Sequence, residues 1–270
     1  MALTDFQRTV CRLLAAHRVA SGESYVAGGV ALNEWLGAPR LSRDVDLFHD
    51  TESAVDRSWK EDRALLESSG YAVRVVRERP GFVEAEIRSE GTSLHLEWVR
   101  DSSFRFFPLV EHEELGLTLH PFDLATNKLL ALVGRREVRD WIDILECHAR
   151  LQPLGYLAWA ACGKDPGFSP STLVETAARG GRFTASEVAG LAFAGEAPDL
   201  AALSRAWHAA IDQARDLIEA LPPENAGCCV LDAAGRLLDL ALADLPGALA
   251  RGEIRFHSGS IRGAFPTLVP

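Results

Sequence analysis

The spacing of apolar and polar residues divides the chain into a mixed N-terminal part and a helical C-terminal part. Phe6, Val10 and Leu14 recur close to the 3.6-residue period of an amphipathic helix, whereas residues 44–48 alternate as a strand does. The pattern predicts helices at 4–20, 30–37 and 52–68, a short apolar run at 25–27, and strands at 44–48, 71–76, 82–87 and 94–99. We therefore expect mixed α and β structure over the first 110 residues.

The pattern of apolar and polar residues changes at about residue 121. Two helices are predicted at 123–134 and 138–151, and the following Ala- and Leu-rich chain has few strand signals. Loops are expected at 163–171, 195–199 and 222–227, and Trp35, Trp98 and Trp141 are expected in the core. After Arg251 the chain is interrupted by Gly, Ser and Pro, which predicts loose packing. The expected domains are an α/β core at 1–120 and a helical domain at 121–270.

The composition is typical of a globular protein in a reducing compartment. The chain has 270 residues, 47% of them hydrophobic and 24% charged, enough for one large domain or two small ones. No stretch of about 18 uncharged apolar residues occurs and charges interrupt the N-terminus, so we expect no membrane span and no secretion signal. Five cysteines without a CxxC pair fit a reducing environment. We expect a soluble protein of the cytoplasm.

The candidate chemistry lies in a Gly-Gly pair followed by two aspartates. Gly28 and Gly29 open a predicted helix, where backbone N–H groups can approach a phosphate and the helix N-terminus favours its charge. Asp44 and Asp46 stand two residues apart on a predicted strand, so both side chains point to one face. Two close carboxylates repel each other unless a cation lies between them, and Mg²⁺ prefers oxygen ligands and substrate phosphates. The pattern indicates a metal-dependent phosphoryl-transfer site.

The segment YVAGGVALNEWLGAPRLSRDVDLF resembles the signature of the DNA polymerase β-type nucleotidyltransferase superfamily. More narrowly, it is similar to the AbiEii/AbiGii-type (MenT-like) nucleotidyltransferase toxins. Their Arg-x-Ser-like lead-in is matched by Leu41-Ser42-Arg43, and their later helix with a lysine and an aspartate by residues 127–132 and 139–143. The resemblance covers residues 20–150. It implies an α/β fold, with a nucleotidyltransferase core that has a mixed β-sheet, plus a mostly α-helical C-terminal domain.

The resemblance also implies roles for the residues of the first motif. Gly28, Gly29 and Ser42, followed by Arg43, would bind the triphosphate of an NTP substrate. Asp44 and Asp46 would be catalytic and would hold Mg²⁺ or Mn²⁺. The motif therefore implies a nucleotide site and a metal site on adjacent elements.

In the later part of the chain, the resemblance implies that the helical domain contributes to a cleft. Lys128 would contact the nucleotide phosphates, and Asp143 or Asp140 would complete the catalytic site, with Asp143 preferred. Glu97 is the candidate for a third carboxylate, which would take the proton of the attacking hydroxyl as a general base.

Each of these residues also has an ordinary structural interpretation. The Gly-Gly pair is compatible with a tight turn alone, and the two aspartates with a solvated strand face. Lys128 is compatible with a solvated helix position, and one of Asp140 and Asp143 with an ion pair to a nearby arginine. Glu97 is compatible with an exposed strand position. The occurrence of both motifs in order favours the metal site.

The resemblance implies transfer of a nucleoside monophosphate to an acceptor hydroxyl, that of a tRNA 3′ end, by a toxin that a partner antitoxin neutralises. Arg135, Arg136 and Arg139, with Arg251, Arg255 and Arg262 as further candidates, could supply the local basic patch that RNA phosphates require. The net charge of −10 fits a small acceptor better than RNA. A nucleotidyltransferase acting on a small molecule, of the antibiotic-modifying type, is therefore one alternative, and a non-catalytic nucleotide-binding module is another.

Overall fold

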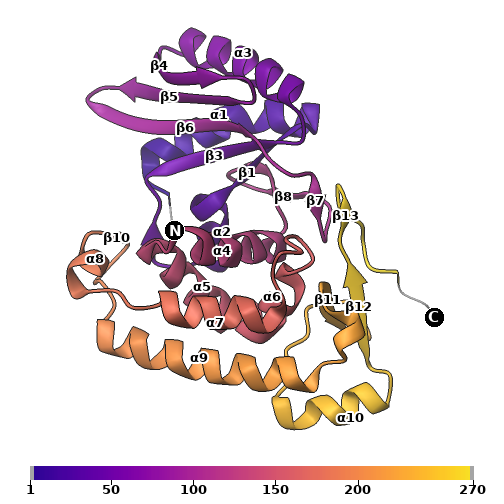
Figure 1. Ribbon diagram of the computed structural model, residues 1–270. Helices are drawn as coiled ribbons and strands as arrows, with labels where there is room; N and C mark the ends of the chain where they lie inside the picture. Colours follow the sequence, from indigo (N-terminus) through magenta and orange to yellow (C-terminus); the bar gives the residue numbers. More distant parts are fainter. Residues whose placement is uncertain (1–2, 268–270) are drawn as a thin grey trace. The chain divides into compact units, whose positions relative to one another are not determined.

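The computed structural model describes residues 3–267 and divides into two compact units. The sheet unit comprises Met1–Ser103 and Leu109–His120, and the helical unit comprises Phe104–Pro108 and Pro121–Pro270. The short segment Phe104–Pro108 thus packs with the later part of the chain. The expected α/β class is confirmed, with a mixed sheet in the first unit and mostly helices in the second (Figure 1).

The sheet unit is built on a seven-stranded sheet of order β4-β5-β6-β3-β1-β9-β8. Its helices are α1 (Asp5–Ser21), α2 (Gly28–Leu36) and α3 (Glu52–Ser68). Its strands are β1 (Ser24–Ala27), β2 (Arg40–Leu41), β3 (Asp44–His49), β4 (Ala72–Arg79), β5 (Phe82–Ser89), β6 (Thr92–Arg100), β8 (Val110–His112) and β9 (Gly116–Thr118). The β3–β6 and β1–β9 pairs are parallel and the other neighbours antiparallel, which makes the sheet mixed.

The two faces of this sheet differ in polarity because side chains alternate along each strand. Leu47 on β3 is paired with Trp98 on β6, and both are buried on the face that α3 covers. Trp59 of α3 packs edge-on against Trp98, with ring centroids 4.8 Å apart. Asp44 and Asp46 alternate with the buried residues of β3, so their side chains lie on the opposite face.

The helical unit packs its helices around several aromatic residues. Its helices are α4 (Pro121–Arg135), α5 (Val138–Arg150), α6 (Leu154–Ala161), α7 (Pro170–Gly180), α8 (Ala185–Ala189), α9 (Leu200–Ala220) and α10 (Leu245–Ala250), with 3₁₀ turns η1 (Pro223–Asn225) and η2 (Leu242–Asp244). Its strands are β7 (Phe104–Arg105), β10 (Ala192–Phe193), β11 (Cys228–Asp232), β12 (Ile254–Ser258) and β13 (Ser260–Ile261). Tyr156 and Trp159 of α6 pack with Leu217 of α9 in one buried cluster.

Asp123 at the start of α4 explains why the segment Phe104–Pro108 belongs to the helical unit. Its buried carboxylate accepts hydrogen bonds from the backbone N–H groups of Phe106 and Phe107, at 2.9 and 3.0 Å. Lys164 neutralises the same carboxylate, with Nζ 2.7 Å from Oδ1. These contacts satisfy backbone donors that burial would otherwise leave unpaired.

Two expectations about packing are wrong. Trp98 and Trp141 are buried as expected, but Trp35 is 36% exposed, and its indole N–H donates to Thr118 Oγ1 at 2.9 Å. The chain after Arg251 is not uniformly loose, since β12 pairs with β11 and β13 pairs with β7. Gly and Ser residues lie at the ends of these short strands, and the partner strands are distant in the sequence. Every helix within residues 3–267 is too short or too polar to cross a lipid bilayer.

Candidate active site

Gly28 marks the point where β1 ends and α2 begins. Its φ of +66° is in the left-handed region that glycine adopts without strain. A Cβ at this position would overlap the carboxylate of Asp46, which lies directly against the glycine. The residue before it, Ala27, has no polar side chain to cap the first N–H groups of α2. The turn thus brings an acidic side chain and a helix N-terminus together.

Ser42 and Arg40 lie beside the second glycine. A Cβ at Gly29 would come 3.2 Å from Ser42 Oγ and 2.5 Å from Arg40 Nη2, so both side chains approach the backbone of α2. Arg40 is only 3% exposed, and its Nη1 donates to the carbonyl of Leu41 at 3.2 Å. Arg40 was not predicted as a site residue, although Arg40-Leu41-Ser42 has the Arg-x-Ser order. Arg43, the arginine predicted instead, has an exposed side chain.

Asp44, Asp46 and Glu97 share one face of the sheet. The parallel register of β3 and β6 pairs Asp44 with His95 and Asp46 with Glu97. Both aspartates and Glu97 are partly buried. Burial raises the pKa of Glu97 above its ordinary value, and the negative charges of Asp46, Glu84 and Asp44 raise it further. Negative charge is therefore concentrated at the α2 end of β3.

The carboxylate oxygens on this face suit a cation such as Mg²⁺, but few side chains supply them. Carboxylate oxygens are the ligands that Mg²⁺ prefers, and Asp44 and Asp46 provide them on adjacent positions of one face. Within residues 3–267, no group of three or more His, Cys, Asp or Glu side chains is arranged to hold a metal ion. Any metal here would need ligands from substrate phosphates and water, which is how proteins commonly bind Mg²⁺.

Lys128, Asp140 and Asp143 meet in the helical unit. Lys128 Nζ on α4 lies 2.9 Å from Asp140 Oδ1 and 3.2 Å from Asp143 Oδ2 on α5. Arg135 also donates to Asp140, with Nε 2.7 Å from Oδ2. The arginine ion pair that was an alternative for one of the two aspartates is thus made by Asp140. Lys128 is 7% exposed and both aspartates are fully buried.

The arginines expected to form a basic patch are partly occupied by intramolecular contacts. Arg135 pairs with Asp140, and Arg136 Nη2 donates to the carbonyl of Arg179 at 3.2 Å. Arg139 has a partly buried side chain. Of the three, Arg135 therefore has its charge partly neutralised by a buried carboxylate.

The structure brings the candidate residues together in two sets. Gly28, Gly29, Ser42, Asp44, Asp46 and Glu97 belong to the sheet unit, and Lys128, Asp140 and Asp143 belong to the helical unit. The first set combines backbone donors with carboxylates, which suits a phosphate and its counterion. The second set holds one lysine against two acidic side chains.

A family model and several solved structures are similar to this chain. A family model described as "Nucleotidyl transferase AbiEii toxin, Type IV TA system" matches residues 12–214. No curated protein sequence matches the chain. The crystal structure of JHP933 from Helicobacter pylori is similar with a TM-score of 0.55 and 17% identity, covering 80% of this chain and 95% of that chain. This likeness supports the fold alone.

Two further solved structures are more distant. A putative nucleotidyltransferase from H. pylori has a TM-score of 0.49 and 16% identity, covering 82% of this chain and 99% of that chain. MenT4, the nucleotidyltransferase toxin Rv2826c from Mycobacterium tuberculosis H37Rv, has a TM-score of 0.49 and 14% identity, covering 80% of this chain and 83% of that chain.

Proposed function

The chain belongs to the AbiEii family of nucleotidyl transferase toxins of type IV toxin–antitoxin systems, and we propose that it transfers a nucleoside monophosphate to the 3′ end of a tRNA. Family membership makes the protein a nucleotidyltransferase and implies an NTP substrate and a cognate antitoxin. The proposal adds the acceptor, the dependence on Mg²⁺, the residues of the site and an action in the cytoplasm.

The close approach of Asp46 to Gly28 is the observation that carries the proposal. It places a carboxylate beside the first turn of α2, whose backbone N–H groups lack a capping side chain at Ala27. A nucleotide triphosphate requires donors for its oxygens and a cation for its charge. In the sheet unit, the backbone at Gly28 and the carboxylate of Asp46 would meet these two requirements.

Asp44 and Asp46 would hold the Mg²⁺ ion together with the nucleotide phosphates. When bound, the ion would neutralise negative charge on the triphosphate and on the departing pyrophosphate. Gly29 offers a backbone without a side chain, and Ser42 and Arg40 offer donors beside it. These three residues would bind and orient the triphosphate, with Arg43 at the exposed side of the same segment.

Glu97 would hold the proton that the acceptor hydroxyl loses when its oxygen attacks the α-phosphorus of the NTP. Its raised pKa makes it a better proton acceptor than an ordinary glutamate. In the helical unit, Lys128 would contact the nucleotide phosphates. Asp143 and Asp140 would hold the lysine side chain in place, and Arg135 is the second partner of Asp140.

The test is an incubation of the purified protein with Mg²⁺, total tRNA and each α-labelled NTP in turn. Asp46→Asn is run in parallel, because it removes a charge from the site at nearly constant volume. Asp56→Asn is the matched control, since Asp56 is an exposed residue of α3 in the same unit. Label on tRNA from one preferred NTP, retained by Asp56→Asn and lost in Asp46→Asn, is the expected result.

The other outcomes separate the alternatives. Mg²⁺-dependent nucleotide binding without label on tRNA contradicts the RNA acceptor and favours a small molecule or a protein. Absence of nucleotide binding contradicts the proposal. If tRNA is the acceptor, its binding should weaken steeply with added salt, because phosphate contacts release counterions.

A further inference from the structure

The side chain of Gln7 on α1 holds the segment that carries Ser42. Its Nε2 donates to the carbonyl oxygens of Ser42 at 2.8 Å and of Arg43 at 3.2 Å. Gln7 is 4% exposed, so water competes little for these bonds. The two contacts join positions 35 and 36 residues apart.

The orientation of the Gln7 amide follows from its neighbours. Its Oε1 accepts from the backbone N–H of Thr4 at 2.9 Å, while the Thr4 hydroxyl accepts from the N–H of Gln7 at 3.2 Å. This capping box turns the amide oxygen toward Thr4 and leaves both side-chain N–H bonds for the two carbonyls. A reversed amide would set an oxygen against two carbonyl oxygens, which excludes it.

The segment that Gln7 holds lies between β2 and β3. Residues 42–43 belong to neither strand, so strand pairing does not fix them directly. Ser42 Oγ approaches Gly29 on one side of it, and Asp44 begins β3 on the other. A small displacement here would move the hydroxyl and the start of the acidic strand together. Positioning errors of about 1 Å can cost an enzyme about 100-fold in rate.

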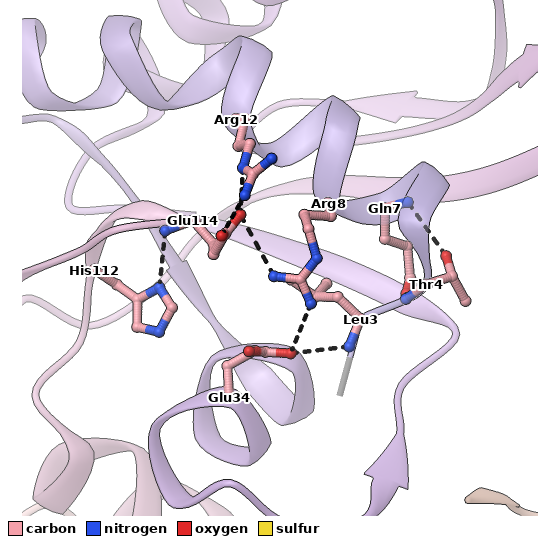
Figure 2. Close-up of polar contacts among 8 residues, drawn as sticks. All are labelled: Leu3, Thr4, Gln7, Arg8, Arg12, Glu34, His112 and Glu114. Atoms are coloured by element: carbon pink, nitrogen blue, oxygen red, sulfur yellow. Dashed lines mark hydrogen bonds and ion pairs between the residues drawn. The ribbon is translucent and has the colours of Figure 1, made fainter. Parts of the chain in front are cut away.

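The same end of α1 is also tied to α2 (Figure 2). The backbone N–H of Leu3 donates to Glu34 Oε1 at 3.0 Å, and Arg8 Nη2 lies 3.8 Å from that oxygen. Arg8 Nη1 lies 3.4 Å from Glu114, which also pairs with Arg12. The start of α1 therefore contacts both the helix that follows the Gly-Gly pair and the segment with Ser42.

We propose that Gln7 is a positioning residue for nucleotide binding, which fixes Ser42 and the start of β3 against the N-terminus of α2. The inference rests on the proposed function, because it assigns the triphosphate to this place. Gln7 itself touches no substrate. It acts through the two carbonyl oxygens that it binds, and its loss raises the KM for the NTP.

The experiment compares Gln7→Glu with Thr4→Ala. Glutamate keeps an acceptor for the Thr4 N–H but loses both donors and sets an oxygen against the carbonyls. Thr4→Ala removes the hydroxyl cap of the same helix and leaves the Gln7 donors intact, so it measures the effect of a weakened helix end alone. Each variant is measured for the KM of NTP and of tRNA, and for the Kd of α,β-methylene analogues of the four NTPs in the presence of Mg²⁺.

Gln7→Glu, which loses both buried hydrogen bonds, is expected to raise the nucleotide KM and Kd by about tenfold or more, with the tRNA KM unchanged. Thr4→Ala is expected to change each by less than about twofold. Equal effects of the two variants, or an effect of Gln7→Glu on kcat alone, would overturn the proposal. Gln7→Met, which has neither donors nor an opposing oxygen, replaces Gln7→Glu if that variant does not fold.

The Kd measurement separates this inference from the proposed function. If the wild-type protein binds the analogue but labels no tRNA, the proposed acceptor is wrong, and the Kd ratio still decides the role of Gln7. If the wild-type protein binds no nucleotide, both proposals fail.

Discussion

Lys128 and Asp140 form a buried ion pair, with Nζ 2.9 Å from Oδ1. Burial raises the pKa of Asp140, but the hydrogen bonds from Arg135 and the charge of Lys128 outweigh it and hold that pKa below its ordinary value. An enclosed pair is costly to break, because the surviving charge stays desolvated.

Asp140→Asn is expected to lower the free energy of unfolding by about 1–3 kcal/mol at pH 7, measured in urea, because Lys128 keeps Asp143 as a partner at 3.2 Å. Because the pKa of the native carboxyl is depressed, its contribution is present above the unfolded pKa and is lost as the pH falls through the native one. The difference between wild type and variant should thus shrink below about pH 4. Arg135→Met should cost less than about 1 kcal/mol, since the Arg135 side chain is 48% exposed. Equal losses of stability in Asp140→Asn and Arg135→Met would contradict the larger role of the buried carboxylate.

Gly28→Ala is expected to slow nucleotidyl transfer, because its Cβ would displace the Asp46 carboxylate. Gly37→Ala is the matched control: Gly37 has a similar φ of +59°, and a Cβ there would meet no neighbouring part of the chain within 4 Å. Both variants should lose about 1 kcal/mol or more of stability from the positive φ. Only Gly28→Ala should lose transfer, by about 100-fold. Comparable activity in both would show that the glycine is needed only for its backbone conformation.

The pH dependence of transfer should report Glu97. A general base must be deprotonated, so kcat/KM should fall as the pH drops through the raised pKa of this carboxyl. Glu97→Gln should abolish most of the activity, and the activity that remains should no longer show this fall at low pH. The free energy of unfolding depends on pH in the opposite direction. Because the pKa is raised, the native state favours protonated Glu97, and the stability gained from this is lost as the pH rises through the native pKa. Glu97→Gln should gain thermal stability over wild type between about pH 4 and pH 7; an unchanged difference would contradict the shift.

His49 should make the protein sensitive to mild acid. Burial lowers its pKa to about 4, which the backbone carbonyl of Val99 only partly offsets. A depressed histidine pKa contributes stability that is complete above the unfolded pKa and is lost as the pH falls toward the native one. Between about pH 7 and pH 5, wild type should lose about 2 kcal/mol more than His49→Leu, as measured by urea unfolding at both values. Parallel losses in the two proteins would refute the prediction.

Local sequence patterns determined several helices and strands, the shared face of the two aspartates and the family of this protein. The 3.6-residue period placed α1 and α3, alternation placed β3, and the same alternation put Asp44 and Asp46 on one face. The family and its first motif also followed from residues close together in the chain. Each of these depends on interactions within a few residues, which the order of side chains alone specifies.

Tertiary structure decided which distant residues meet. The parallel register of β3 and β6 put Glu97 beside Asp46, and the fold of α1 put Gln7 on the carbonyls of Ser42 and Arg43. It also left Trp35 partly exposed where its apolar character suggested the core. No periodicity encodes these outcomes, because strand register and hydrogen bonds between distant segments depend on how whole elements pack.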